Sequence, residues 1–87
     1  MKKLVQVEEV EGEGLIGLMG ERITVFCMNY FYTGKLTSVN GQFVKLEEAA
    51  VVYETGSFDE KEWKDAQKLP KPVYVMISAI ESFCVLK

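Results

Sequence analysis

The chain has 87 residues, which is enough for one domain but too few for a large buried core. Its 13 acidic and 10 basic residues give a formal net charge of −3, so the chain as a whole does not attract nucleic-acid phosphates. It contains no histidine, and therefore lacks the commonest general base and the commonest metal ligand. Hydrophobic residues make up 48% of it, and a domain this small is expected to bury some of them against other copies of itself.

The two cysteines, Cys27 and Cys84, lie far apart in apolar stretches and are expected to be reduced, buried side chains. The basic start of the chain lacks the apolar run of a signal peptide. No stretch approaches the ~20 apolar residues of a membrane span. The sequence therefore predicts a cytoplasmic protein without a membrane partner, organised as one domain over 1–87.

Residues 1–20 are predicted to form an N-terminal arm or turn. The stretch KLVQVEEV (3–10) has partial strand character and equally suits a flexible arm. The stretch GEGLIGLMG (12–20) contains G-x-G-x-x-G, the spacing of dinucleotide-binding sites. That site needs a helix after the glycines, which Gly17 and Gly20 would break, and a strand follows at once. We therefore expect a glycine-rich turn or one helical turn that places Leu15, Ile16, Leu18 and Met19 under a small barrel.

From Arg22 onward the pattern is typical of β-strands. RITVFCM (22–28) is followed by a turn at Asn29-Tyr30, a second strand FYTGKLTSV (31–39), a hairpin turn at Asn40-Gly41 and a long third strand QFVKLEEAAVVYET (42–55). Small residues inside these strands, Gly34 and Ala49-Ala50, predict sharp bending or close approach of backbones.

Residues 57–72 differ in composition from their surroundings and are predicted to be an inserted loop or helix. Ser57 and Glu60 have the spacing of a capping box, and Pro70 ends the segment, so a short helix is expected from about 58 to 68. Trp63 is expected to pack on the barrel beside Phe58 and Leu69. The alternative is that Phe58 and Trp63 form a surface for a protein partner.

The last segment, VYVMISAIESFCVL (73–86), predicts two short apolar strands with a corner at Ser78-Ala79. Glu81 is the one charge inside them, although exposed edge strands usually carry protective charges or prolines. We therefore expect these edges to pair with the same strands of neighbouring subunits in a homo-oligomeric ring. The expected interface residues are Val73, Val75, Ile77, Phe83 and Val85.

The order of these features resembles the Sm/LSm family. ITVFCMNYFYTGKLTSVNGQFVKLEEAAVVYETG (23–56) is similar to the first Sm motif, and MISAIES (76–82) stands where the second motif belongs. GQFV (41–44) is most similar to the bacterial branch, Hfq. The resemblance covers about residues 15–55 and 73–86, and the main alternative is another small barrel, of SH3-like or OB type.

The resemblance implies a mainly β fold. This fold is a five-stranded, strongly bent SH3-like barrel with a short N-terminal helix or turn and a short helix inserted between its third and fourth strands. It further implies a ring of roughly five to seven subunits, joined through the fourth and fifth strands. Single-stranded, U-rich RNA would bind around the pore. Carried over residue by residue, the RNA-binding positions are Asn40, Gln42, Phe43 and Ser78, with Phe43 as the stacking aromatic.

The sequence departs from the family where RNA binding needs positive charge. The Lys-His pair of the Hfq branch, or the Arg-Gly of the eukaryotic and archaeal branch, falls on Ile77-Ser78-Ala79, where no cation stands. The asparagine that fixes uracil in the latter branch has no counterpart. Since phosphate neutralisation supplies most nonspecific affinity, weak RNA binding is expected. Phe43 also fits a core position, because it alternates with Val44 at the start of a strand.

The sequence is compatible with two functions: a ring that binds RNA, and a ring that serves as a protein-interaction scaffold without RNA. An enzyme is not expected. The adjacent carboxylates Glu8-Glu9 and Glu47-Glu48 would point to opposite faces of a strand. No nucleophile is paired with a base and no metal-ligand spacing occurs, so no catalytic residue, cofactor or metal site is predicted.

Overall fold

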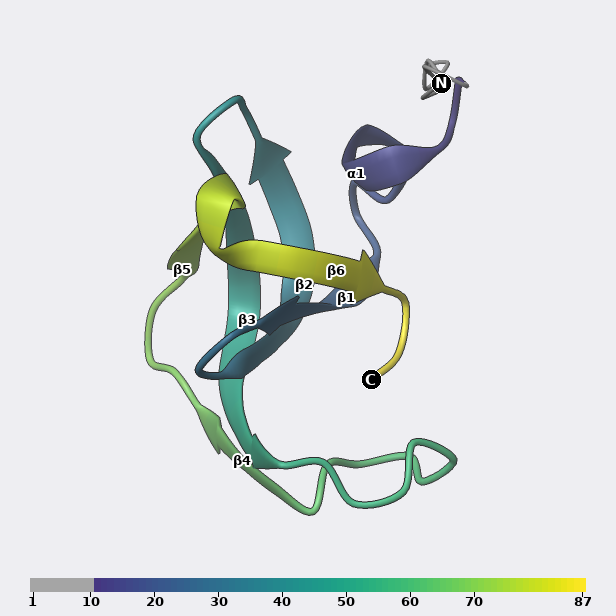
Figure 1. The fold of residues 1–87 in the computed structure, drawn as a ribbon, viewed down its shortest axis with the longest axis vertical. Coiled ribbons are helices and arrows are strands. Elements are labelled where there is room, and N and C mark those ends of the chain that lie inside the picture. Colours follow the sequence, from purple (N-terminus) through teal and green to yellow (C-terminus); the bar gives the residue numbers. More distant parts are fainter. Residues whose placement is uncertain (1–10) are drawn as a thin grey trace, which may run out of the picture.

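A computed structural model describes residues 11–87, and the arm predicted at 3–10 lies outside this range. The described chain forms a short helix, six strands and a 3-10 turn (Figure 1). In chain order these are α1 (Gly14–Gly17), β1 (Arg22–Cys27), β2 (Phe31–Val39), β3 (Phe43–Glu54), β4 (Asp65–Lys68), β5 (Val73–Met76), η1 (Ile77–Ala79) and β6 (Ile80–Cys84).

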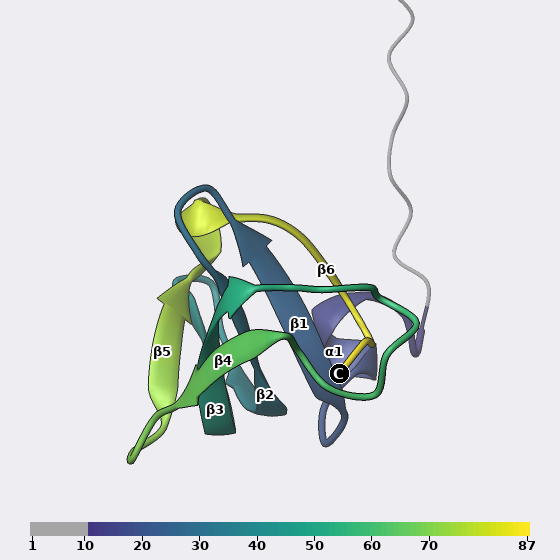
Figure 2. The same ribbon diagram turned by 90° about the horizontal axis from the view of Figure 1, so that it is seen from below.

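All six strands belong to one antiparallel sheet, ordered β4-β3-β2-β1-β6, with β5 also paired to β3. The long strand β3 has two partners along one edge: its first residues, Phe43–Leu46, pair with β5, and Ala50–Glu54 pair with β4. Figure 2 shows the resulting curvature of the sheet, with β5 and β6 on two of its sides. The turn η1 connects β5 to β6. The mainly β prediction is confirmed, with six strands where five are expected.

A bulge in the middle of β3 produces the bend that the small residues predict. Lys35 of β2 pairs with Glu47, but Thr33 pairs with Ala50, so β3 has an extra residue here. Glu48 has a positive φ of 49°, a conformation unusual for a residue with a side chain. Its carbonyl oxygen accepts a hydrogen bond from Arg22 Nη1 at 3.0 Å. Because a bulge disrupts the ladder locally, this bond supplies a partner for the displaced backbone.

Gly34 lies opposite this bulge and leaves no room for a side chain. A Cβ at Gly34 would lie 2.9 Å from Leu46 Cβ, 3.0 Å from Glu47 O and 3.2 Å from Ala49 Cα. Two of these three atoms are backbone atoms, which cannot rotate away. The expectation of close backbone approach at Gly34 is therefore confirmed.

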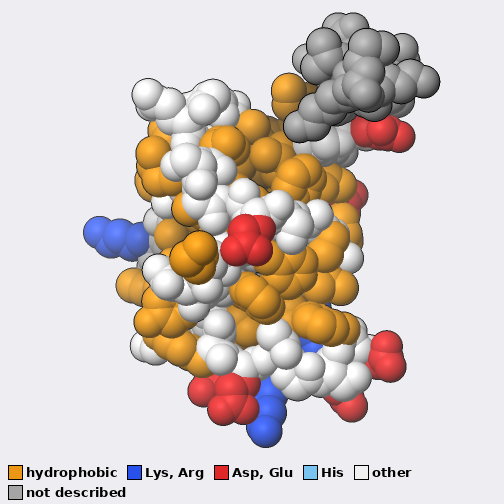
Figure 3. Space-filling view, in the orientation of Figure 1, with side chains coloured by type: hydrophobic (Ala, Val, Ile, Leu, Met, Phe, Trp, Pro, Cys, Tyr) orange, Lys and Arg blue, Asp and Glu red, His pale blue; other side chains and the backbone are white. Residues whose placement is uncertain are grey.

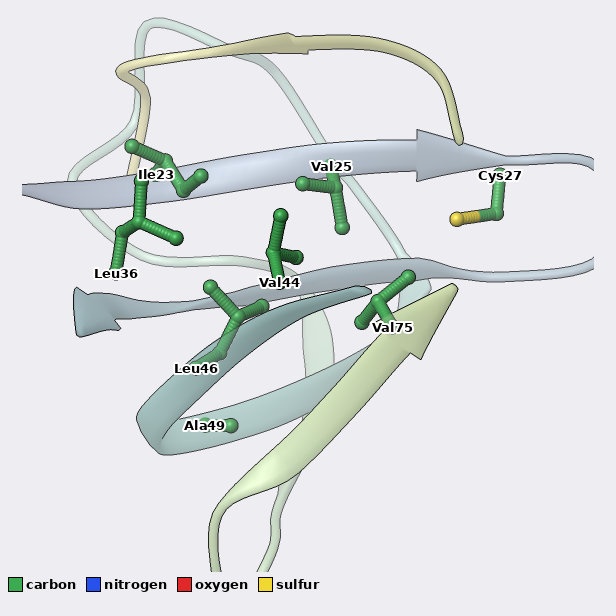
Figure 4. Packing of buried hydrophobic residues seen from close by; sticks show 8 residues of the cluster. All are labelled: Ile23, Val25, Cys27, Leu36, Val44, Leu46, Ala49 and Val75. Carbon is green, nitrogen blue, oxygen red and sulfur yellow. The ribbon is translucent and has the colours of Figure 1, made fainter. Parts of the chain in front are cut away.

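The core lies on the inner side of the curled sheet (Figure 4). Strand alternation supplies it, since Val44 and Leu46 of β3 point inward while Phe43 and Lys45 do not. Val75 closes it from β5 at 5% exposure. The buried cluster consists of Ile23, Val25, Cys27, Leu36, Val44, Leu46, Ala49 and Val75.

The other face of β1 and β2 is covered where the chain end meets the loop 55–64. Thr24 and Thr33 are fully buried there, and Thr33 Oγ1 lies 2.8 Å from the carbonyl oxygen of Lys87. Trp63 Nε1 donates to the same oxygen at 2.8 Å. The ammonium of Lys87 lies 4.7 Å from the centre of the Trp63 ring and donates to Ser57 O and Glu62 O. These contacts fix the loop against the sheet.

The helix predicted at about 58–68 does not form. Ser57 makes one turn, with its carbonyl accepting from Glu60 N–H at 3.2 Å, and its hydroxyl accepts from Asp59 N–H at 3.3 Å. Asp65–Lys68 then pairs with the far half of β3 as β4. The prediction was wrong because that half of β3 offers an open edge, and pairing with it outweighs a weak local helix preference.

The glycine-rich segment before β1 forms the helical turn that the sequence predicts, but fewer of its apolar side chains pack against the core than expected. α1 is one helical turn, and Leu15 and Leu18 pack against the core. Ile16 and Met19, expected beneath the sheet as well, are 77% and 44% exposed. A four-residue helix presents only one side to the sheet, so the other apolar side chains face solvent.

Substitution Gly34→Ala should lower the free energy of unfolding by about 1–3 kcal/mol, because the new Cβ forces β2 and β3 apart. Urea denaturation followed by circular dichroism measures this. Gly41→Ala is the matched control, since nothing lies within 4 Å of a Cβ there, and it should change stability by less than about 0.5 kcal/mol. Equal effects of the two substitutions would contradict the steric explanation.

Candidate functional site

The turn between β2 and β3 is the hairpin that Asn40-Gly41 predicts. Asn40 Oδ1 accepts hydrogen bonds from the N–H groups of Gln42 and Phe43 at 2.8 and 2.9 Å, and Asn40 N–H donates to Phe43 O at 3.1 Å. The amide oxygen of Asn40 therefore holds the turn together. The side-chain NH2 group of Asn40 takes no part in these bonds and is free to bind a ligand. Gln42 is exposed beside it.

The 3-10 turn η1 lies directly against this hairpin turn (Figure 1). Ile77 N–H donates to Gln42 O at 2.8 Å, which joins the end of β5 to the start of β3. Ser78, the next residue, is exposed. The sequence-predicted RNA-binding residues are thus gathered at one end of the molecule, although Ser78 is 35 residues beyond Phe43 in the sequence.

An exposed cluster of two aromatic rings, a thioether and an ammonium group lies next to this turn, on the outer side of β3 and β5. Phe43 pairs with Met76 and Lys45 pairs with Tyr74 across the two strands. The rings of Phe43 and Tyr74 meet edge to face, with centroids 5.0 Å apart and an interplanar angle of 88°. Lys45 Nζ lies 5.8 Å from the centre of the Tyr74 ring. We call this surface, made of Phe43, Lys45, Tyr74 and Met76, the aromatic face.

The exposure of these side chains distinguishes the aromatic face from the core. Tyr74 and Met76 are 55% and 52% exposed, and Phe43 is half-buried, while Val44 and Val75 beside them are buried. Phe43 therefore lies on the outer side of the sheet. Tyr74 and Met76 are not among the residues that the sequence predicts for a binding site. Alternation in VYVM places both on the face opposite Val75, but only the strand register places them against Phe43.

Strands β5 and β6 each have one unpaired edge within residues 11–87, since β5 pairs with β3 and β6 with β1. An apolar groove lies between β5, the β1–β2 turn and the start of β6. Its lining includes Cys27, Tyr30, Tyr32, Val75 and Ile80, with Glu81 as the charged group. Figure 3 shows that the face carrying β6 is covered mainly by hydrophobic side chains.

The residues predicted for a subunit interface differ in where their side chains point. Val75 is buried in the core, and Val73, Ile77 and Phe83 are half-buried against it. Val85 is 52% exposed. The edges therefore present mostly main-chain N–H and C=O groups, with Val85 as the exposed apolar side chain among these five.

The residues predicted for a protein partner lie at the opposite end of the molecule, in the loop 55–64. The Phe58 and Trp63 rings meet at right angles with centroids 6.1 Å apart. Trp63 is half-buried and bound to Lys87, whereas Phe58 is 53% exposed. Leu69, expected beside them, packs against the core.

The acidic charge of the protein is not spread evenly. Segment 54–65 holds five acidic and two basic residues, and 11–21 holds three acidic residues and no basic one. In contrast, 22–53 has three basic and two acidic residues, and 66–87 has three basic and one acidic. The strands that form the aromatic face thus belong to the positive part of the sequence, and the acidic loop lies at the far end of the long axis (Figure 1).

Residues 11–87 contain neither a metal-binding cluster nor a membrane-spanning helix. No group of three or more His, Cys, Asp or Glu side chains there could hold a metal ion. None of the helices in that range is long and apolar enough to cross a membrane.

Two titratable groups on the groove are shifted. Burial, with a smaller contribution from the negative charge of Glu81, raises the pKa of the Cys27 thiol. Burial also raises the pKa of the Tyr32 phenol, with smaller contributions from Cys27, Tyr30 and Tyr53. Both groups therefore favour their neutral forms, which suits an apolar groove and does not suit a nucleophile.

Comparisons of the chain with protein-family models, with curated proteins and with solved structures found no match.

Cys27 should react with iodoacetamide more slowly than Cys84 at pH 8, because burial and the raised pKa both limit its thiolate. Variants Cys84→Ala and Cys27→Ala isolate each thiol, and mass spectrometry measures the alkylation rate. In urea the two rates should become similar. Faster reaction of Cys27 in the folded protein would contradict the assigned environment.

Proposed function

We propose that this protein is a ring-forming protein of Sm type that binds single-stranded, U-rich RNA beside the turn between β2 and β3. The observation that supports this most is the hydrogen bond from Ile77 N–H to Gln42 O, which holds η1 against that turn next to the half-buried ring of Phe43. Aromatic rings beside exposed polar groups suit unpaired bases, since every base offers a face for stacking. The proposal includes a barrel-like closure of the sheet through η1.

Ring formation is supported by the unpaired edges of β5 and β6. β5 and β6 lie on different sides of the molecule, so pairing β5 of one copy with β6 of the next is a head-to-tail contact, which can close into a ring. The β5 edge carries no charged residue or proline from Val73 to Met76. Strand edges without such protection tend to pair with a strand of another chain. The proposal places this ring in the cytoplasm, where the free cysteines would stay reduced.

RNA binding is supported by the separation of charge. A net charge of −3 weakens the attraction of the whole chain to phosphate, but the acidic loop 54–65 stands apart from the aromatic face. Over distances larger than about 8–10 Å at physiological salt, such charges are largely screened. The attraction of phosphate to the aromatic face therefore depends more on nearby charges, such as that of Lys45, than on the net charge of the chain.

An interaction scaffold without RNA is the second candidate. It is supported by Phe58, whose ring is 53% exposed on the acidic loop. Such a ring, held by Trp63 from one side, can anchor a protein partner.

Native mass spectrometry of the protein should detect one closed oligomer whose mass is a multiple of 9.9 kDa. Val85→Lys should shift it towards the monomer, because a charge directly after β6 would be desolvated where that strand pairs with the next copy. Ile16→Lys is the matched control, since it changes an exposed apolar residue of α1, which belongs to neither strand, and should leave the oligomer intact. A monomeric wild-type protein would exclude the ring.

Fluorescence anisotropy with a labelled oligouridine tests RNA binding. Phe43→Ala should weaken binding about 5- to 150-fold, since one stacked base contributes about 1–3 kcal/mol. Phe58→Ala, the control, should leave binding unchanged, and thermal unfolding checks that both variants fold. A closed ring that binds no oligouridine would favour the scaffold.

A further inference from the structure

We infer that Tyr74 is a base-stacking residue and Lys45 its phosphate-binding cation, so that the RNA strand runs from the β2–β3 turn across the outer side of β3 and β5. This inference rests on the proposed RNA-binding function and extends it beyond Phe43. It assigns to the same ligand two residues from two strands, which only the register between β3 and β5 brings together.

The first support is the exposure of the two rings. Tyr74 is 55% exposed and Phe43 is half-buried, so Tyr74 offers the larger surface to a ligand. Because the rings meet at 88°, they cannot enclose one base between parallel planes. They can instead receive two successive bases of a single strand, one against each ring. Met76, opposite Phe43 and 52% exposed, adds a flexible apolar contact at the end of the surface.

The second support is the position of the ammonium group. Lys45 is directly opposite Tyr74, and its Nζ lies 5.8 Å from the ring centre, near the outer limit of a cation–π contact. Such a contact is weak on an exposed surface, so a base can displace the ammonium group from the ring. The flexible side chain then places its charge beside the phosphate that joins the two bases.

The third support is charge complementarity around the face. Alternation along β3 places Glu47 on the same side as Lys45, and Lys35 of β2 is directly opposite Glu47. One carboxylate is thus accompanied by two ammonium groups on this part of the sheet. A peptide ligand would have no need of these cations unless it were acidic, whereas a nucleic-acid strand carries one phosphate for each base.

The aromatic face also remains accessible in the proposed ring. Edge pairing uses the main-chain groups of β5, while Tyr74 and Met76 extend from the sheet on the side away from the core. A strand added to β5 would therefore widen the surface and leave it uncovered.

The test is fluorescence anisotropy with labelled oligouridine on the wild-type protein and a set of variants. Tyr74→Ala should weaken binding about 5- to 150-fold, and Tyr74→Phe, which keeps the ring, should bind within about threefold of the wild type. Lys45→Gln should reduce the slope of log affinity against log salt concentration by about 0.7, the change expected for one phosphate contact on a single strand. The control Lys61→Gln, in the acidic loop, should leave that slope unchanged.

The outcomes separate this inference from the function on which it rests. If the wild type binds and Phe43→Ala weakens binding, but Tyr74→Ala and Lys45→Gln do not, the assignment of Tyr74 and Lys45 is wrong and the proposed function stands. If the wild type binds no oligouridine, both are wrong. If an acidic peptide binds to the aromatic face of the wild-type protein and oligouridine does not, the ligand is a protein. Thermal unfolding of each variant excludes loss of fold as the cause.

Discussion

The bulge at Glu48, opposite Gly34, is the constraint on which the rest of the structure depends. It lets one long strand change direction within the sheet, so that the first part of β3 pairs with β5 and the last part with β4. Without a side chain at Gly34, the backbones of β2 and β3 can approach closely enough for this bend. Arg22 supports it by donating to the carbonyl of the bulged residue. The inner side of the bend holds the core, and its outer side carries the aromatic face.

The same bend separates the two surfaces that a partner could use. The turn 40–42, η1 and the aromatic face lie towards one end, while the loop 55–64 with Phe58 and Trp63 lies at the other (Figure 1). Because most of the acidic residues of the described chain belong to 11–21 and 54–65, the strands between carry a small positive excess. Composition alone therefore understates how well the aromatic face suits an anionic ligand. The loop is fixed by Lys87, whose ammonium and carbonyl groups both bind within it or beside it.

Much of the fold could be predicted because it depends on local patterns. The first three strands, the hairpin at Asn40-Gly41 and the corner at Ser78-Ala79 follow from β-branched runs and turn residues, and the structure confirms them. The helix at 58–68 was predicted from the capping pattern at Ser57 and Glu60. That pattern describes only the first turn, and β4 forms because Asp65–Lys68 meets the open edge of β3, which is a tertiary partner.

The amino-acid sequence by itself determined that this protein is a small, mainly β domain with sharp bends at Gly34 and Ala49-Ala50, since steric limits and strand alternation act between near neighbours. It placed Phe43 and Val44 on opposite faces without determining which face is inward. Only the tertiary structure decided that Val44 enters the core and that Phe43 meets Tyr74, 31 residues away. The physical reason is that register between β3 and β5 is fixed by burying Val44, Leu46 and Val75 together, a condition on the whole core that no single stretch of the chain contains.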